Sequence, residues 1–203
     1  LSRKEIAEAR ANKLKEGEGE AGAPQAGSSF YGIALKGENA YFILDRSGSM
    51  DSKQGSFTRM EKLKEEFNKL IGAMQASGKK HTFGVAFFPG MQRFPAKGMC
   101  ALDEASIGDF QKFMKSITSG GDTPLKGAMK YFFDEIADKA DVDTVYLLSD
   151  GEPTDAPPYA IPGDITVWNL GRNIRINTVS IGLESDMMKS IAGMNGGEYR
   201  SVR

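Results

Sequence analysis

Two residue types that often build reactive or metal-binding sites are scarce in this sequence of 203 residues. It contains one cysteine, Cys100, and one histidine, His81. A single cysteine excludes a disulfide within the sequence and a zinc site made of several thiolates. A single histidine excludes any site that requires two imidazoles. We expect Cys100 to be a packed, inert thiol and His81 to have a structural role.

A strong charge of one sign and long apolar runs are also lacking. The formal net charge is −1, which gives no indication of binding to nucleic acid or to an anionic membrane. No apolar run approaches the roughly 18 residues that span a bilayer, so we predict no membrane span in this sequence. Because the sequence begins at Leu1, we expect it to be part of a longer chain. It does not identify the compartment, and a location outside the cytoplasm or in the cell envelope is compatible with it.

Composition divides the sequence into an N-terminal segment and one globular domain. Residues 1–16 are charged and rich in helix formers, and residues 17–29, "GEGEAGAPQAGSS", are typical of a flexible linker. From residue 30 onward, apolar runs become regular. Hydrophobic residues make up 40% and charged residues 26% of the whole, as in ordinary globular proteins. We therefore predict a segment of residues 1–29 and a domain of residues 30–203.

Within that domain, predicted strands and helices alternate. The stretches "AYFILD", "HTFGVAFFPG", "DTVYLLSDG" and "IRINTVSIG" are near-continuous apolar runs, which is typical of strands buried on both faces. Helical spacing or composition predicts helices at 57–75, 103–117, 123–140, 167–174 and 185–197. "FYGIAL" and "AYFILD", separated by "KGEN", predict a hairpin. The alternation predicts an α/β fold with a doubly wound sheet.

Polar residues follow three of the predicted strands or open a helix beside them. Asp45, Ser47 and Ser49 follow "AYFIL", Thr123 lies in "SGGDTPL" before the third helix, and Asp150 ends "VYLL". Ligands of open α/β sheets bind beyond the carboxyl ends of the strands, so we expect these side chains to meet. Two carboxylates and three hydroxyls suit a hard cation, Mg²⁺ first, with Mn²⁺ or Ca²⁺ as alternatives. Alternation along the loop should point Ser47 and Ser49 the same way, beside Asp45.

A purely structural interpretation exists for several of these residues. Serine and aspartate also favour turns by bonding to the backbone, and "DRSGS" alone could be only a turn. The spacing of Thr123 and Asp150 is what favours a metal site. We expect Asp122 to be a turn or cap residue. Glu152 and Asp155 are expected to face solvent, where they could influence the choice of partner.

The five positions together resemble a known family. D-x-S-x-S, a distant threonine after a glycine-rich turn, and the aspartate of "SDGEPT" are similar to the metal-ion-dependent adhesion site of the von Willebrand factor A domain. The resemblance covers residues 38–203 and leaves residues 1–29 without a counterpart. The stretch "FYGIALKGENAYFILDRSGSM" most resembles bacterial members of unassigned function.

The resemblance implies a Rossmann-like, mostly parallel sheet with helices on both faces. It also implies direct metal ligation by the two serines and, in one state, by the threonine, while the aspartates often act through water. An open coordination position would accept a Glu or Asp from a partner protein. Two carboxylates and three neutral hydroxyls leave a divalent ion short of negative charge, which agrees with a metal-dependent protein-interaction module.

Two other functions remain open. The metal could serve only to stabilise a scaffold, because metal binding couples to folding. An aspartate at a strand end beside Mg²⁺ is also found in aspartyl-phosphate phosphatases, which need a second carboxylate two positions later as general acid. This sequence has Ser47 there, and "RSGSM" is not the G-x-S-x-G of serine hydrolases. We therefore predict that the protein is not an enzyme.

Overall fold

The computed structural model describes residues 28–203. The predicted N-terminal segment, residues 1–29, lies outside the described residues except for its last two, Ser28 and Ser29. Among the described residues, no helix combines the length and the apolar character that crossing a bilayer requires.

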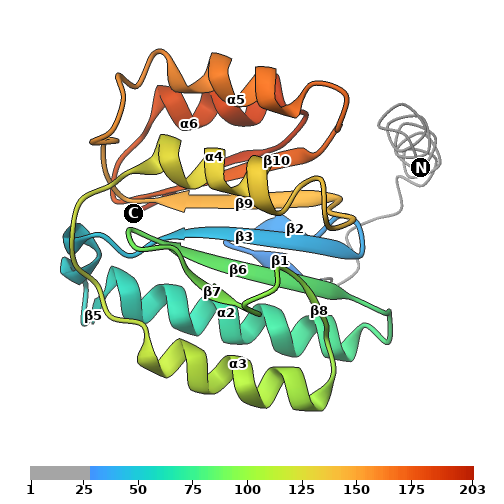
Figure 1. Cartoon of the computed structure of the whole chain (residues 1–203). Helices are drawn as coiled ribbons and strands as arrows, with labels where there is room; N and C mark the ends of the chain where they lie inside the picture. The colour runs from blue at the N-terminus through green and yellow to red at the C-terminus, as the bar shows by residue number, and fades with distance from the viewer. Residues whose placement is uncertain (1–27) are drawn as a thin grey trace.

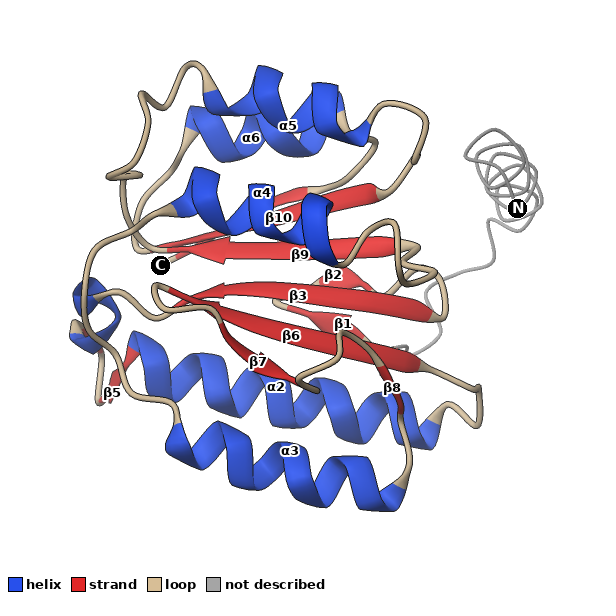
Figure 2. Ribbon diagram, viewed as in Figure 1, coloured by secondary structure: helices blue, strands red, loops and turns tan. Residues whose placement is uncertain are grey.

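A central sheet of seven strands organises the domain (Figures 1 and 2). Its order is β11-β10-β9-β3-β6-β7, and β8 also pairs with β6. The neighbours from β11 to β6 are parallel, whereas β7 and β8 run antiparallel to β6. The prediction of a doubly wound, mostly parallel sheet is confirmed. The strands are β3 (Asn39–Asp45), β6 (Thr82–Phe88), β7 (Gln92–Phe94), β8 (Cys100–Ala101), β9 (Thr144–Ser149), β10 (Arg175–Ile181) and β11 (Tyr199–Val202).

Helices cover both faces of this sheet, as predicted. Figure 2 shows α2 (Arg59–Ala76) and α3 (Glu104–Ser116) on one face. On the other face lie α4 (Leu125–Glu135), α5 (Ile161–Asn169) and α6 (Asp186–Met194). Helix α2 begins at a capping box, in which Thr58 and Glu61 satisfy each other's backbone N–H groups. Its buried residues recur at helical spacing and are Met60, Leu63, Phe67, Leu70, Ile71 and Met74.

The strands are buried on both faces because successive side chains enter two different cores. Phe42 and Leu44 of β3 belong to the core under α2 and α3, and Tyr41 and Ile43 belong to the core under α4, α5 and α6. This is the period of two expected for a strand. The ring of Phe42 stacks on that of Tyr146 from β9, with centroids 5.1 Å apart. Such continuous burial explains why these strands are nearly unbroken apolar runs in the sequence.

The strand order reverses direction at β3. After β3 the chain forms β6 on one side of it, and later forms β9 on the other side. The loops that leave β3 and β9 therefore diverge over opposite faces, and the region between them, beyond the carboxyl ends of these two strands, is called the crevice below. In Figure 1 this is the edge toward which the β3 and β9 arrows point. Asp45 and Asp150 lie at these two strand ends.

Two predicted elements were wrong in detail. "FYGIAL" does not pair with "AYFILD". It folds on itself, with β1 (Ser29–Phe30) antiparallel to β2 (Ile33–Ala34). Tyr31 and Gly32 both have left-handed backbone, with φ of 49° and 78°, so the chain reverses inside the run. The helix predicted at 167–174 instead spans Ile161–Asn169, because residues 171 and 173 have positive φ and end helical structure there.

Candidate metal centre

The five predicted residues gather at the carboxyl edge of the sheet. Asp45 is the last residue of β3, and Asp150 directly follows β9. Ser47 directly precedes the short 3-10 helix η1 (Gly48–Asp51), and Ser49 is the second residue of that helix. The Oγ of Ser49 and the Oγ1 of Thr123 both lie close to Gly151: a Cβ placed on that glycine would be 3.7 Å and 3.6 Å from them.

A line of short contacts joins three of these side chains. The hydroxyls of Ser47 and Ser49 are 2.9 Å apart, and Ser49 donates a hydrogen bond of 2.6 Å to Oδ1 of Asp150. Adjacent ligands of an octahedral Mg²⁺ are also separated by about 2.9 Å, given Mg–O bonds of 2.0–2.1 Å. The two hydroxyls thus lie side by side, as their alternation along the loop predicts. Ser47 and Asp150 are buried and Ser49 between them is exposed, so the line reaches solvent at Ser49.

Asp45 is the most buried of the five residues. Its side chain is fully buried and accepts two hydrogen bonds, 2.7 Å from the N–H of Ser47 and 2.6 Å from the hydroxyl of Ser149. Burial raises the pKa of the Asp45 carboxyl, and the hydrogen bonds from Ser149 and Ser47 only partly oppose it. Among residues 28–203, no lysine, arginine or histidine forms an ion pair with this carboxylate. Buried carboxylates normally have a cation or a metal nearby, so this position is suited to a cation.

Backbone contacts hold the loop after β3 against the glycine-rich turn before α4. Gly48 donates to the carbonyl of Gly121 at 3.0 Å, and Gly120 donates to that of Arg46 at 2.7 Å. The side chain of Arg46 also donates to the carbonyl of Pro89 at 2.9 Å. Gly121 has φ of 88°, and a Cβ there would be 2.9 Å from the ring of Pro89, so only glycine fits. This turn brings Thr123 to the two serines.

A second set of contacts ties Thr123 to the loop after β9. The N–H of Thr123 donates to Oγ1 of Thr154 at 3.2 Å, and Thr154 returns a backbone hydrogen bond of 2.9 Å. Asp155 is exposed, as predicted, but it also caps α4. Its carboxylate accepts hydrogen bonds from the N–H groups of Lys126 and Gly127, at 3.2 Å and 2.7 Å. This role was missed because the cap comes from 28 or more positions away in sequence rather than from the residue before the helix.

Arg59 is a member of the site that sequence reasoning did not identify. It is the first residue of α2, and its Nη1 forms an ion pair of 2.6 Å with Oδ2 of Asp150. The carboxylate of Asp150 is fully buried, and the Arg59 side chain is 20% exposed. No local pattern in the sequence connects two residues that are 91 positions apart. The two carboxylates of the site therefore differ: Asp150 has a cationic partner, and Asp45 has none among the described residues.

The chemistry of the donor set fits a hard divalent cation. Among the described residues, no three His, Cys, Asp or Glu side chains gather into a cluster that could hold a metal. A metal here would be bound by hydroxyls together with Asp45 and Asp150, which are the oxygen ligands that Mg²⁺, Mn²⁺ and Ca²⁺ accept. Asp122 and Glu152 are exposed and make none of these contacts.

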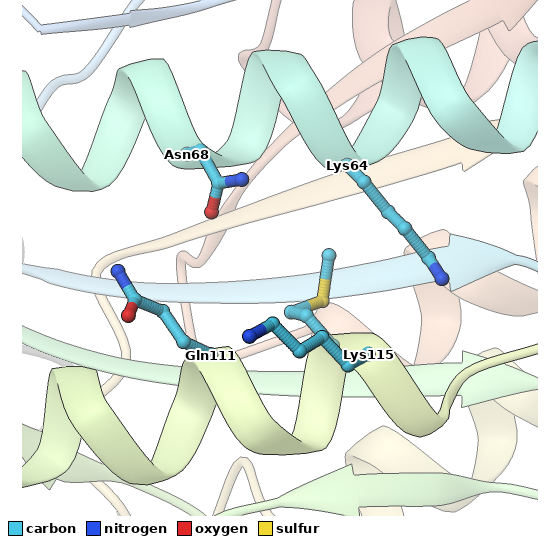
Figure 3. Close-up of a pocket in the computed structure, with 5 residues that line it drawn as sticks. Lys64, Asn68, Gln111 and Lys115 are labelled. Atoms are coloured by element: carbon cyan, nitrogen blue, oxygen red, sulfur yellow. The ribbon is translucent and has the colours of Figure 1, made fainter.

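A groove of about 330 Å³ elsewhere on the molecule contains none of these residues. Figure 3 shows it between α2 and α3, with side chains from both helices pointing into it. Lys64 lines it, and its ammonium group donates a hydrogen bond of 2.7 Å to the carbonyl of Ile117. Burial lowers the pKa of Lys64. Its hydrogen bond to Ile117, the residue that follows α3, gives it a structural role. The other lining residues are Asn68, Gln111, Met114 and Lys115.

Comparison with known proteins gives a family match. The sequence model of the von Willebrand factor type A domain matches residues 40–152, which is more than half of the chain. That range contains all five predicted site positions. A search among curated proteins gave no match.

Solved structures of low sequence identity share the fold. A von Willebrand factor type A structure from Catenulispora acidiphila matches with a TM-score of 0.70 and 20% identity, over 84% of this chain and 39% of that one. The VWA domain of SpRpn10 matches with a TM-score of 0.63 and 11% identity, over 81% of this chain and 87% of that one. The protein BatB from Bacteroides thetaiotaomicron matches with a TM-score of 0.55 and 16% identity, over 82% and 90%. This chain thus spans well under half of the Catenulispora chain, and at these identities the likeness shows the fold alone.

Proposed function

Because the chain belongs to the von Willebrand factor type A family, we propose that it is a metal-dependent protein-interaction module. Its divalent cation, Mg²⁺ in the first place, is held by Asp45, Ser47, Ser49, Thr123 and Asp150. The observation that supports this most is the fully buried Asp45, without an ion pair among the described residues, below a line of serine hydroxyls. The family often mediates metal-dependent protein interactions, and the five positions resemble its adhesion site in sequence.

The charge of the site favours a partner that supplies Glu or Asp. Asp45, Asp150 and Arg59 together carry a charge of −1, so a bound dication leaves +1 at the crevice. Ser47, Ser49 and Thr123 are neutral ligands and do not reduce the ion's charge. An incoming carboxylate would neutralise the site, which is a physical reason for recognition of an acidic side chain. Ser49 is the exposed member through which the partner would approach.

Exposed aromatic side chains border this edge of the molecule. Phe57 is 53% exposed and lies two positions before Arg59. Tyr159 is 86% exposed and lies on the connection from β9 to α5, which also carries Asp150. Aromatic residues are enriched in protein interfaces and often contribute much of the binding energy. They support a protein partner at this edge rather than a small ion alone.

An enzymatic role lacks one necessary residue. Phosphatases that use an aspartyl-phosphate need a carboxylate two positions after the nucleophile, and here Ser47 has that place, with its hydroxyl beside Ser49. We propose that the protein is not an enzyme. The resemblance to bacterial members of the family remains a prediction. A scaffold that uses the metal only for stability is the alternative, and it predicts no partner that depends on the metal.

The test measures Mg²⁺ and partner binding with Thr123 variants. Calorimetry gives the Mg²⁺ affinity, and pull-downs from native lysate with Mg²⁺ or chelator identify a partner whose acidic residues are then replaced. Thr123→Val removes the hydroxyl at constant shape and should weaken partner binding more than Mg²⁺ binding. Thr123→Ser keeps the hydroxyl and should bind both. A partner that binds equally well in chelator, or without any of its acidic residues, would contradict the proposal.

A further inference from the structure

We propose that Arg59 is a built-in counter-cation that sets both the metal affinity and the anion preference of this site. The inference rests on the proposed function, because it requires that a divalent cation binds at the five positions. In this proposal Arg59 holds Asp150 in place when no metal is bound. It also lowers the affinity for the dication and leaves the loaded site with a net positive charge that attracts a carboxylate.

The contacts of Asp150 show that Arg59 belongs to the site itself. Oδ1 of Asp150 accepts from the hydroxyl of Ser49 at 2.6 Å, and Oδ2 accepts from Arg59 at the same distance. One carboxylate thus bridges a proposed metal ligand and a guanidinium. The backbone N–H of Arg59 also donates to the carbonyl of Ser52 at 3.1 Å, which fixes the start of α2 beside the loop that carries the serines. Metal binding at Ser49 and Asp150 would therefore act directly on the ion pair between Asp150 and Arg59.

The fold provides a fitted place for this guanidinium. Gly182 follows β10 with φ of 80°, and a Cβ on it would be 2.2 Å from Nη2 of Arg59 and 2.8 Å from Cζ. Any other residue at 182 would have to push the guanidinium away. The Nε of Arg59 is buried and has no hydrogen-bond partner among the described residues. A buried unpaired donor costs free energy, so the ion pair with Asp150 forms in spite of that cost. A solvent-exposed arginine would not be held in this way.

Burial makes this charge effective. The carboxylate of Asp150 is fully buried and Arg59 is 20% exposed, so solvent screens the pair much less than an ordinary surface pair. With Arg59 the charged groups sum to −1 before metal binding and to +1 after it. Without Arg59 the sums are −2 and 0. Arg59 therefore opposes the dication and favours an anionic ligand, and these two effects have opposite signs.

The experiment compares Mg²⁺ binding by calorimetry in the chain of residues 1–203 and four variants. Arg59→Gln should bind Mg²⁺ about tenfold more tightly than the wild type, since it removes a nearby positive charge. Arg59→Lys keeps the charge and should stay close to the wild type. Arg172→Gln is the matched control: Arg172 is also 20% exposed and pairs with a carboxylate, that of Asp138, at the opposite edge of the sheet. It should leave the Mg²⁺ affinity unchanged.

The fourth variant, Gly182→Ala, tests the same effect without replacing Arg59. Gly182→Ala displaces the guanidinium from Asp150 without changing any charge of the chain, and it should also tighten Mg²⁺ binding. Melting in chelator gives an independent measurement. Arg59→Gln should melt at a lower temperature than the wild type, because Asp150 loses its partner, and should gain more from added Mg²⁺.

The outcomes separate this inference from the proposed function. If the wild type binds Mg²⁺ and Arg59→Gln binds it equally or more weakly, Arg59 is only a brace for the loop and the inference is wrong. If neither protein binds Mg²⁺, the metal site and this inference both fail. Binding by Arg59→Gln alone would support the inference and contradict the proposed function, because the wild-type arginine would then exclude the metal.

Discussion

Replacement of Asp45 by asparagine should stabilise the metal-free protein. The carboxylate of Asp45 is fully buried, accepts two hydrogen bonds and has no ion pair among the described residues. Burial raises the pKa of this carboxyl more than the hydrogen bonds lower it. Asparagine can keep both contacts. Its oxygen would accept from the N–H of Ser47, and its amide would donate to Ser149. The hydroxyl of Ser149 could then turn toward the carbonyl of Gly151, which is 3.4 Å away.

The magnitude follows from two opposing effects. The effective cost of burying an ion is several kcal/mol, and Asp45→Asn removes it. Two hydrogen bonds to a charged acceptor become neutral, which loses about 1 kcal/mol each. The net expectation is a gain of about 1 to 2 kcal/mol in the free energy of unfolding. For a domain of this size, each kcal/mol raises the melting temperature by about 2–4 °C.

The assay is thermal and denaturant unfolding at neutral pH, first in chelator and then with Mg²⁺. Asp45→Asn should exceed the wild type in chelator and gain nothing from Mg²⁺, whereas the wild type should be stabilised. Asp143→Asn is the control. Asp143 accepts hydrogen bonds from the backbone of Glu38 and Asn39 at 3.1 Å, before β9 and away from the crevice, so its variant should keep the response to Mg²⁺. A loss of more than about 1 kcal/mol for Asp45→Asn in chelator would refute the reasoning.

Two further predictions concern alkaline pH and the cap of α4. Burial raises the pKa of Tyr41 and Tyr146, so folding keeps both protonated; this contribution is complete below the ordinary value of about 10 and is lost as pH rises above it. Their phenolate absorbance should appear together with loss of circular dichroism, and a gradual titration in the folded protein would contradict this. Asp155→Ala should lower the free energy of unfolding by about 1 kcal/mol in denaturant titrations, because the first turn of α4 loses its cap, while Glu152→Ala, an exposed neighbour, should not.

The sequence was sufficient for the parts of the structure that depend on local pattern. Continuous apolar runs identify β3, β6, β9 and β10 because both faces of these strands are buried. Helical spacing identifies α2 because only one face of this helix is buried. The gathering of the five polar residues could be predicted because strand ends of a parallel sheet meet at one edge. The hairpin of residues 29–34 was missed because left-handed backbone at Tyr31 reverses the chain inside an apolar run. Arg59 and the cap by Asp155 were missed because each contact joins the first turn of a helix to the loop after β9, which only the tertiary fold brings together.

The two aspartates of the crevice, Asp45 and Asp150, differ in their partners, and this difference bears on both the order of the site and its affinity for a cation. Asp150 is held by Ser49 and Arg59, so its position does not depend on a metal. Asp45 has hydrogen bonds but no cationic partner among the described residues, so it gains most when a cation arrives. If both carboxylates were paired in this way, the crevice would be ordered but would have little affinity for a dication. If neither were paired, the two carboxylates would balance the charge of a bound dication, so the shortage of negative charge expected from the sequence would arise only through Arg59. In the proposed function, one paired and one unpaired aspartate would give an ordered crevice that binds a dication and still requires a further negative charge, which would come from the partner.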